Sequence, residues 1–270
     1  MAQRKPLEEL TLMDDYMFYA VMKRPDLLKK LLELILEIKI TDLIYSKGQE
    51  TMKEGYDSRG IRLDVFVKDE TGRWYNIEVQ TTDKKDIPKR ARYNQAVVDV
   101  DNLKPGTNFT DLPESYVIFI TKFDTHTNNR RLRWFEYRDR YDKDTVLGDG
   151  TNNVIVNIVG TNGEVSKDLQ SIIDYLRTGV AGDDYTKELD EEVARVKVSD
   201  ERKREYMRII TYADELRRDE HLETTANHIV NLMKSLSFDE TKAMDVLQVP
   251  AKERDEVSGL VKEILNAVSA

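Results

Sequence analysis

Two short segments rich in β-branched and aromatic residues constrain the fold of this chain more than any other feature. Residues 61–67 read Ile-Arg-Leu-Asp-Val-Phe-Val, and residues 75–80 read Tyr-Asn-Ile-Glu-Val-Gln. Between them, residues 69–72 read Asp-Glu-Thr-Gly, a composition typical of a tight turn. The pattern predicts two adjacent β-strands joined as a hairpin.

The expected hairpin places two carboxylates on one face of the sheet. Side chains alternate between the faces of a strand, so Asp64 shares a face with Phe66, and Glu78 shares a face with Gln80. Two carboxylates in a mostly apolar sheet repel each other and lose hydration, so a counter-charge or a cation is expected between them. Mg²⁺ or Mn²⁺ would suit these oxygen ligands. The pair therefore suggests metal-assisted hydrolysis. The alternative is that Asp64 caps a turn and Glu78 is an exposed strand residue.

The elements around the hairpin indicate an α/β sandwich with a mixed sheet. Leucines and isoleucines at helical spacing in residues 26–38 predict a helix that covers one face of the sheet. Residues 115–121 form a nearly continuous apolar run, as in a strand buried on both faces. The expected elements are helices at 12–22, 26–38 and 87–103, and strands near 41–52, 61–67, 75–80, 115–121, 132–137 and 153–159.

The helix expected at residues 87–103 follows directly after the second hairpin strand. Its buried face is expected to carry Ala91, Val97, Val98 and Tyr93. Several of its polar residues are candidates for phosphate contact, and the alternative for each is a solvated helix face.

The C-terminal third of the chain differs in character, because it is strongly charged and helical in pattern. We therefore expect an α/β domain over residues 1–180 and a helical region over residues 181–270. The final helices lack the excess of basic residues that a DNA-reading helix needs. A packing or oligomerisation role is expected for this region instead.

Composition limits the compartment and the partners. The chain has no cysteine, no pattern of a signal peptide and no apolar run that could span a bilayer, which predicts a cytoplasmic protein with no membrane partner. The net charge of −9 disfavours binding to nucleic acid. However, basic residues cluster after the hairpin and again within residues 130–140, and local charge matters more than the sum.

An ordered set of segments resembles a known family. The set comprises Asp-Asp-Tyr-Met-Phe at residues 14–18, Arg-Leu-Asp-Val at 62–65, Asn-Ile-Glu-Val-Gln at 76–80, Lys-Arg-Ala-Arg-Tyr at 89–93 and Tyr-Val-Ile-Phe-Ile at 116–120. It resembles the PD-(D/E)XK nuclease superfamily, and within it the transposase-associated recombination-promoting nuclease (Rpn) family, over roughly residues 10–160. The resemblance implies a restriction-endonuclease-like αβββαβ core with a mixed sheet.

The resemblance also implies an activity, a cofactor and site residues. The implied activity is that of a metal-dependent DNA endonuclease, transposase-like and linked to DNA recombination, with Mg²⁺ or Mn²⁺ as cofactor. Asp64, Glu78 and the backbone carbonyl of Val79 would hold the metal, with Asp14 as an additional carboxylate. Gln80 would orient the attacking water. The expected DNA-binding residues are Lys84, Lys89, Arg90, Arg92 and Gln95.

Gln80 departs from the superfamily pattern, which has lysine at this position. A neutral amide orients water but cannot offset negative charge, so Lys84 or Arg92 would have to supply the cation. This departure and the net acidity support an alternative, a catalytically weak or inactive nuclease-fold protein that acts as an interaction module. For the active enzyme, cleavage of both DNA strands would need two sites, which favours a homodimer.

Overall fold

A computed structural model describes residues 5–45, 65–103, 106 and 108–269 of the chain. Asp64 and the rest of residues 61–64 lie outside the described residues, so the expected pairing of Asp64 with Glu78 stays a prediction. The expected strand near 41–52 is described for Leu43–Tyr45.

The core is a six-stranded mixed sheet with the strand order β1-β2-β3-β4-β6-β5. The first three strands are antiparallel, β3, β4 and β6 are parallel, and β5 is antiparallel to β6. This mixed sheet confirms the predicted α/β class. The strands are β1 (Leu43–Tyr45), β2 (Val65–Asp69), β3 (Trp74–Gln80), β4 (Ser115–Thr121), β5 (Leu132–Phe135) and β6 (Thr151–Asn157).

The hairpin formed by β2 and β3 has the predicted facing of its side chains. Val65 and Val67 are buried on one face, whereas Phe66 on the other face is partly exposed. Gly72 has a φ of 93°, and this left-handed conformation in the turn is one that glycine adopts without strain. Every residue of the central strand β4 is buried, as expected for a strand with parallel neighbours on both sides.

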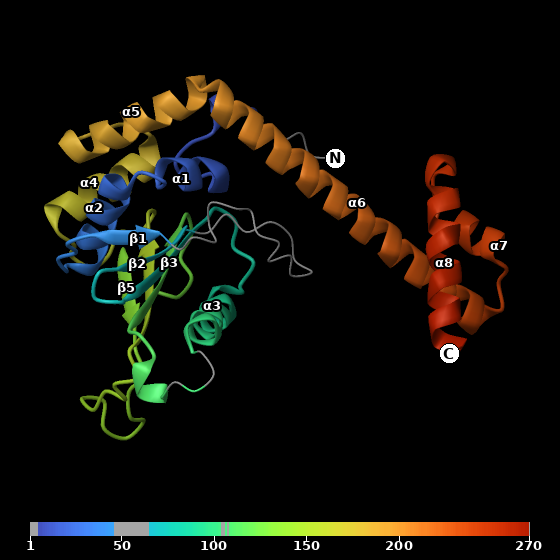
Figure 1. The fold of residues 1–270 in the computed structure, drawn as a ribbon, viewed down its shortest axis with the longest axis horizontal. Helices are drawn as coiled ribbons and strands as arrows, with labels where there is room; N and C mark the ends of the chain where they lie inside the picture. The colour runs from blue at the N-terminus through green and yellow to red at the C-terminus, as the bar shows by residue number, and fades with distance from the viewer. Residues whose placement is uncertain (1–4, 46–64, 104–105, 107, 270) are drawn as a thin grey trace. The chain divides into compact units, whose positions relative to one another are not determined.

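Helices cover both faces of the sheet (Figure 1). The helix α3 (Ile87–Asn102) lies against one face, and α1 (Asp15–Val21) and α2 (Pro25–Leu36) lie on the opposite side. The leucine-rich stripe of α2 is buried, which confirms its predicted packing role. Short 3₁₀ turns occur at Leu7–Glu9, Phe109–Asp111 and Ala251–Glu253.

The buried face of α3 differs from the prediction. Ile87, Ala91, Asn94, Gln95 and Val98 form it, whereas Tyr93 is 37% exposed. The expectation that Tyr93 belongs to the core was therefore wrong. The physical reason is helical phase, because residues spaced by three and four from Ala91 share its face and Tyr93 does not.

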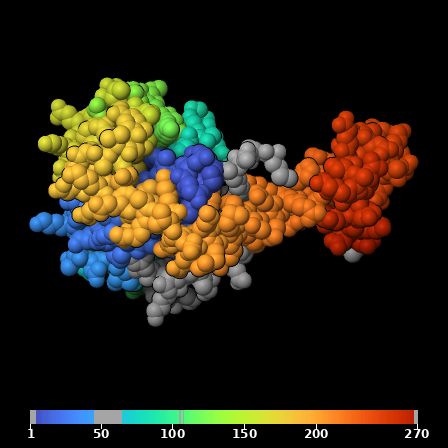
Figure 2. All heavy atoms as spheres, turned by 90° about the horizontal axis from the view of Figure 1, so that it is seen from above, coloured from blue at the N-terminus to red at the C-terminus, as the bar shows by residue number. Residues whose placement is uncertain are grey.

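The chain divides into two compact units. The first extends to Tyr206 and includes α4 (Lys167–Thr178) and α5 (Asp184–Val198), of which α5 follows the boundary expected at residue 180. These two helices pack on each other and on α2, and Figure 2 shows them in yellow and gold at the surface. Within this unit, the Tyr206 hydroxyl donates a hydrogen bond of 2.7 Å to the backbone carbonyl of Lys5.

The second unit begins at Met207 and consists of helices. It contains most of α6 (Asp200–Leu236), then α7 (Glu240–Val246) and α8 (Arg254–Ser269), the last two coloured red in Figure 2. These helices bury a cluster of their own, formed by Leu222, Ala226, Ile229, Val230, Ala243, Met244, Val249, Val257 and Val261. Within the described part of the chain, no helix is both long enough and apolar enough to cross a membrane.

Candidate active site

Glu78 is a buried acid in the middle of the sheet. It is 3% exposed, and it lies on the face of β3 that is turned toward α3, whereas Ile77 and Val79 are buried on the other face. A carboxylate removed from water in this way requires hydrogen bonds and a counter-charge.

Two side chains of α3 donate hydrogen bonds to the carboxylate of Glu78. The amide nitrogen Nδ2 of Asn94 donates a hydrogen bond of 2.6 Å to Oε1, and the guanidinium of Arg90 donates to Oε2 and forms an ion pair. Asn94 also donates to Oδ1 of Asn76 at 3.1 Å. The guanidinium carbon of Arg90 lies 5.7 Å from the ring centroid of Phe119. Arg90, which was expected to contact phosphate, is thus also an ion-pair partner of Glu78.

Local spacing explains why these groups meet. Arg90 and Asn94 are four residues apart on a helix, so they lie on one face, one turn apart. Asn76 and Glu78 are two residues apart on a strand, so they also share a face. Helix and strand periodicity together therefore bring Arg90, Asn94 and Asn76 to the carboxylate of Glu78.

Asp15, at the start of α1, is the described acid whose titration responds to Glu78. Partial removal from water raises the pKa of Asp15, and the negative charges of Asp14 and Glu78 raise it further, while Arg90 opposes the change. Asp15 retains an exposed surface. The pKa of Asp15 therefore responds to the charges of both Glu78 and Arg90.

Asp14, the acid expected to contribute to the metal site, has other partners. Its carboxylate accepts hydrogen bonds from Lys5 Nζ at 2.8 Å, from the Thr11 backbone nitrogen at 2.8 Å and from the Thr11 hydroxyl at 2.9 Å. Burial opposes ionisation, but these donors hold the pKa of Asp14 below its usual value. The metal-binding role of Asp14 stays a prediction. The charge of Glu78 contributes to the raised pKa of Asp15 and is not among the main causes of the pKa shift of Asp14.

The remaining expected residues are arranged around Glu78 in different ways. Gln80 ends β3 on the same face as Glu78 and is partly exposed. Lys84, Lys89 and Arg92 are exposed, as phosphate contacts need to be. Gln95 is 7% exposed and donates to the hydroxyl of Ser115 on β4, so it is not at the surface beside Glu78.

The described donor set fits a hard divalent cation in type. Two carboxylates, Asp15 and Glu78, interact, and oxygen ligands are those that Mg²⁺ and Mn²⁺ prefer. Within residues 5–45, 65–103 and 108–269, no group of three or more acids or histidines has a metal-binding arrangement. A third carboxylate, expected from Asp64, lies outside the described residues.

Sequence reasoning missed Asn76, Asn94 and Asp15. The spacings of two on a strand and four on a helix were present in the sequence, and they would have linked Asn76 to Glu78 and Asn94 to Arg90. Asp15 is the first residue of α1, and Asp14 precedes it at the N-cap position without a capping hydrogen bond from its side chain.

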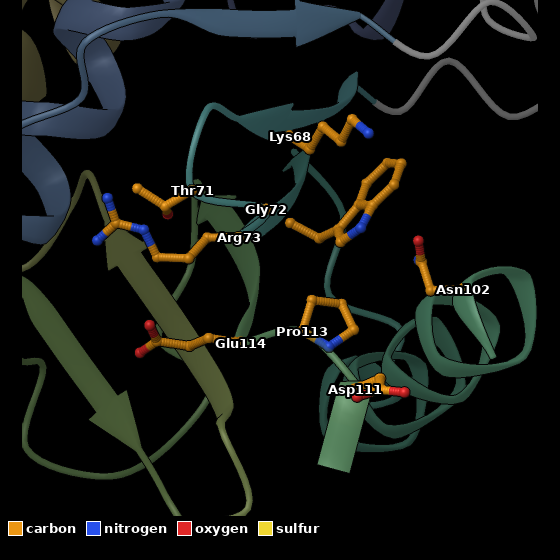
Figure 3. Close-up of a pocket in the computed structure, with 9 residues that line it drawn as sticks. Lys68, Thr71, Gly72, Arg73, Asn102, Asp111, Pro113 and Glu114 are labelled. Carbon is orange, nitrogen blue, oxygen red and sulfur yellow. The ribbon is translucent and has the colours of Figure 1, made fainter. Parts of the chain in front are cut away.

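A wide, open pocket of about 680 Å³ lies at the other end of the hairpin (Figure 3). Lys68, Asn102 and Pro113 surround it, and the guanidinium of Arg73 points to one side. The Lys68 ammonium lies 5.9 Å from the ring centroid of Trp74. Lys68 and Trp74 are paired across the hairpin on the face that carries Glu78, so this face continues with a cation and an aromatic ring.

The fold and the site together define a class. The antiparallel strands β1, β2 and β3, the last of which carries the buried Glu78, are followed by the helix α3 and the parallel strand β4. This order matches the αβββαβ core of a nuclease-type α/β fold. The model of one family, described as PD-(D/E)XK nuclease family transposase, matches residues 12–158, which is more than half of the chain. The chain belongs to this family. Comparison with curated proteins and with solved structures gives no match.

Proposed function

We propose that this protein is a metal-dependent endonuclease that hydrolyses phosphodiester bonds in DNA. The observation that carries the proposal is the buried carboxylate of Glu78, which interacts with Asp15 and is held by Arg90 and Asn94. A buried carboxylate held by a fixed cation, beside an acid whose pKa is raised as that of Asp15 is, is characteristic of catalytic sites. Membership of a nuclease family of transposases supports DNA as the substrate and a role in recombination.

The metal would be Mg²⁺ or Mn²⁺. Glu78 and Asp15 would hold it, together with Asp64 and the Val79 carbonyl. When bound, a divalent cation lowers the pKa of a coordinated water and offsets charge on the phosphate. Cleavage of both strands of a duplex would require a homodimer, since one site cuts one strand.

The residues of the chain would perform the remaining tasks. Arg90, fixed against Glu78, supplies the positive charge that the superfamily lysine would supply at the position of Gln80. Gln80 orients the attacking water through its amide. The exposed Lys84 and Lys89 bind the DNA backbone, which gives affinity with little readout of sequence. Lys68 and Trp74 extend the same face for contact with the substrate.

A second function is favoured by one observation. Arg90 neutralises Glu78 directly, and Gln80 carries no charge, so Glu78 has a counter-ion without a metal. This arrangement supports a catalytically weak nuclease-fold protein that acts as an interaction module.

The test is a plasmid-nicking assay with a Mg²⁺ and Mn²⁺ series. Wild-type protein should nick supercoiled DNA, and Glu78→Ala and Asp15→Asn should each reduce the rate by about 100-fold or more, because each removes a metal ligand. The matched control is Asp101→Asn, which removes an exposed acid of α3 and should leave the rate unchanged.

A melting-temperature series separates the two functions. Metal bound by the folded state should raise the melting temperature of the wild type but not of Glu78→Ala. Wild-type protein that shows neither nicking nor a metal-dependent rise in melting temperature would support the interaction module and exclude the nuclease.

A further inference from the structure

A second pocket lies on the flank of α3 that faces away from Glu78. It has a volume of about 470 Å³ and lies between α3, the strands β4 and β6, and the segment that follows β5. This volume lies within the range of small-molecule sites. None of the residues assigned to metal binding lines the pocket.

The inner wall of the pocket is apolar and aromatic. Ile87 and Ala91 of α3, Phe119 of β4 and Ile155 of β6 line it and belong to one buried cluster. Phe135 and His126 line another side, with their rings stacked at a centroid distance of 5.0 Å. These surfaces can cover an aliphatic chain and the face of a planar cation.

Two buried amide oxygens in this pocket have no hydrogen-bond donor. They are Oε1 of Gln95 and Oδ1 of Asn153, and neither has a partner among the described residues. Gln95 is 7% exposed, and its amide nitrogen is already used by Ser115. Buried acceptors are normally satisfied, so these two oxygens indicate a ligand that brings N–H donors.

The charged side chains that line the pocket favour a positively charged ligand. Three carboxylates line it, from Asp99, Glu136 and Asp149, against one guanidinium, from Arg92. Removal from water raises the pKa of Asp99, a hydrogen bond from the Gln95 side chain partly offsets this, and the negative charge of Asp149 raises the pKa further. Glu136 is paired with Arg138 at 3.0 Å, and Arg92 is exposed. A phosphate-bearing ligand would meet excess negative charge here.

We propose that this pocket binds a guanidinium group carried on an aliphatic stem. A guanidinium offers five N–H donors in one plane, enough to reach the Gln95 and Asn153 oxygens and the Asp99 carboxylate together. Its face can stack on Phe135, and its stem can cover the apolar wall. Two sources carry such a group: a free guanidinium compound and an arginine side chain of a polypeptide. The proposal does not depend on nuclease activity.

The test is calorimetric titration of the full chain with two probes. Agmatine represents a free guanidinium compound, and an end-blocked Gly-Gly-Arg-Gly-Gly peptide represents an arginine side chain. The same peptide with citrulline, which has the shape of arginine without its charge, is the ligand control. Saturable binding of agmatine or of the arginine peptide, with none for the citrulline peptide, is the expected result.

Variants tie the binding to the pocket. Asp99→Asn and Gln95→Met should each weaken binding by about tenfold, because each removes an acceptor. Asp101→Asn, on the same helix but outside the pocket, should bind as the wild type does. Thermal melting followed by circular dichroism confirms that each variant is folded at the temperature used. Asp99→Asn is the decisive variant, since it keeps the shape of the side chain.

The relative affinities of the probes identify the source of the group. Tighter binding of agmatine supports a free compound, and tighter binding of the arginine peptide supports a polypeptide partner. Absence of saturable binding by both probes, equal binding of the citrulline peptide, or unchanged affinity in Asp99→Asn would overturn the proposal.

Discussion

Asp69 shows how one buried charge can fix a turn. It ends β2 with 1% of its surface exposed, and its carboxylate accepts hydrogen bonds from Thr71, Arg73 and Tyr75. The Arg73 Nε lies 2.7 Å from Oδ2, so the charge is also paired. Burial opposes ionisation, but these donors hold the pKa of Asp69 below its usual value. The carboxylate therefore stabilises the hairpin that leads into the Glu78 strand.

Asp69→Asn should lower the free energy of unfolding by about 3 kcal/mol at neutral pH, because Arg73 and Tyr75 would face an amide that cannot replace both oxygens. The folded pKa lies below the unfolded value, so the stabilisation is complete above that unfolded value and is lost as pH falls through the folded pKa. Urea unfolding from pH 7 down to about pH 2.5 should show the gap between wild type and variant closing in acid. A gap that widens in acid would contradict this prediction.

Arg90 and a bound metal would both neutralise Glu78, which gives a second prediction for a single residue. Arg90→Met should lower the melting temperature without metal, because it removes the ion-pair partner of a buried carboxylate. Added Mn²⁺ should then raise the melting temperature of Arg90→Met more than that of the wild type. Arg92→Met, which changes an exposed residue on the same helix, should respond to Mn²⁺ as the wild type does. Equal metal responses in Arg90→Met and wild type would rule out this competition.

At the scale of elements, the backbone that enters β5 packs closely against Gly160, which follows the partner strand β6. A Cβ on Gly160 would lie 2.8 Å from both the Cα and the nitrogen of Arg131, closer than real contacts allow. The same region is held by the Asn157 nitrogen, which donates to the Arg131 carbonyl at 2.8 Å. The backbone after β6 and the backbone entering β5 therefore touch without space for a side chain.

Gly160→Ala should cost roughly 1–3 kcal/mol of unfolding free energy, because the backbone near Arg131 must move. Gly259→Ala is the matched control, since a Cβ there has nothing within 4 Å and lies inside the helix α8. Alanine should stabilise that helix by about 0.5–1 kcal/mol. Chemical denaturation should show a lower free energy of unfolding for Gly160→Ala and a higher one for Gly259→Ala. A neutral Gly160→Ala would show that the contact is readily relaxed.

The elements were predictable where one periodicity dominates. The helix expected at 87–103 is observed at Ile87–Asn102, and the strand at 115–121 is observed with the same bounds. The buried face of α3 was not predictable from apolar residues alone, because two of its five buried residues are the amides Asn94 and Gln95. Amides are buried there since Glu78 and Ser115 bind them, and that reason exists only once the helix lies on the sheet.

At the scale of the molecule, the C-terminal helices have a core separate from that of the sheet. Ile229→Ala should remove about 2–5 kcal/mol from this unit, because Ile229 is completely buried in its cluster. In scanning calorimetry, one transition should move to lower temperature while the transition of the first unit stays in place. Leu236→Ala is the control, since Leu236 is 56% exposed. A single transition that shifts as a whole would show that the two units unfold together.

The parallel arrangement of β3, β4 and β6 has a consequence during synthesis of the chain. The strand β4 acquires its second neighbour after Thr151–Asn157 has left the ribosome. Until then, one edge of a largely apolar strand offers unpaired backbone groups to any other extended segment. Nascent chains stalled at the stage when β4 has left the ribosome and β6 has not should therefore be the ones most prone to aggregate and to recruit chaperones.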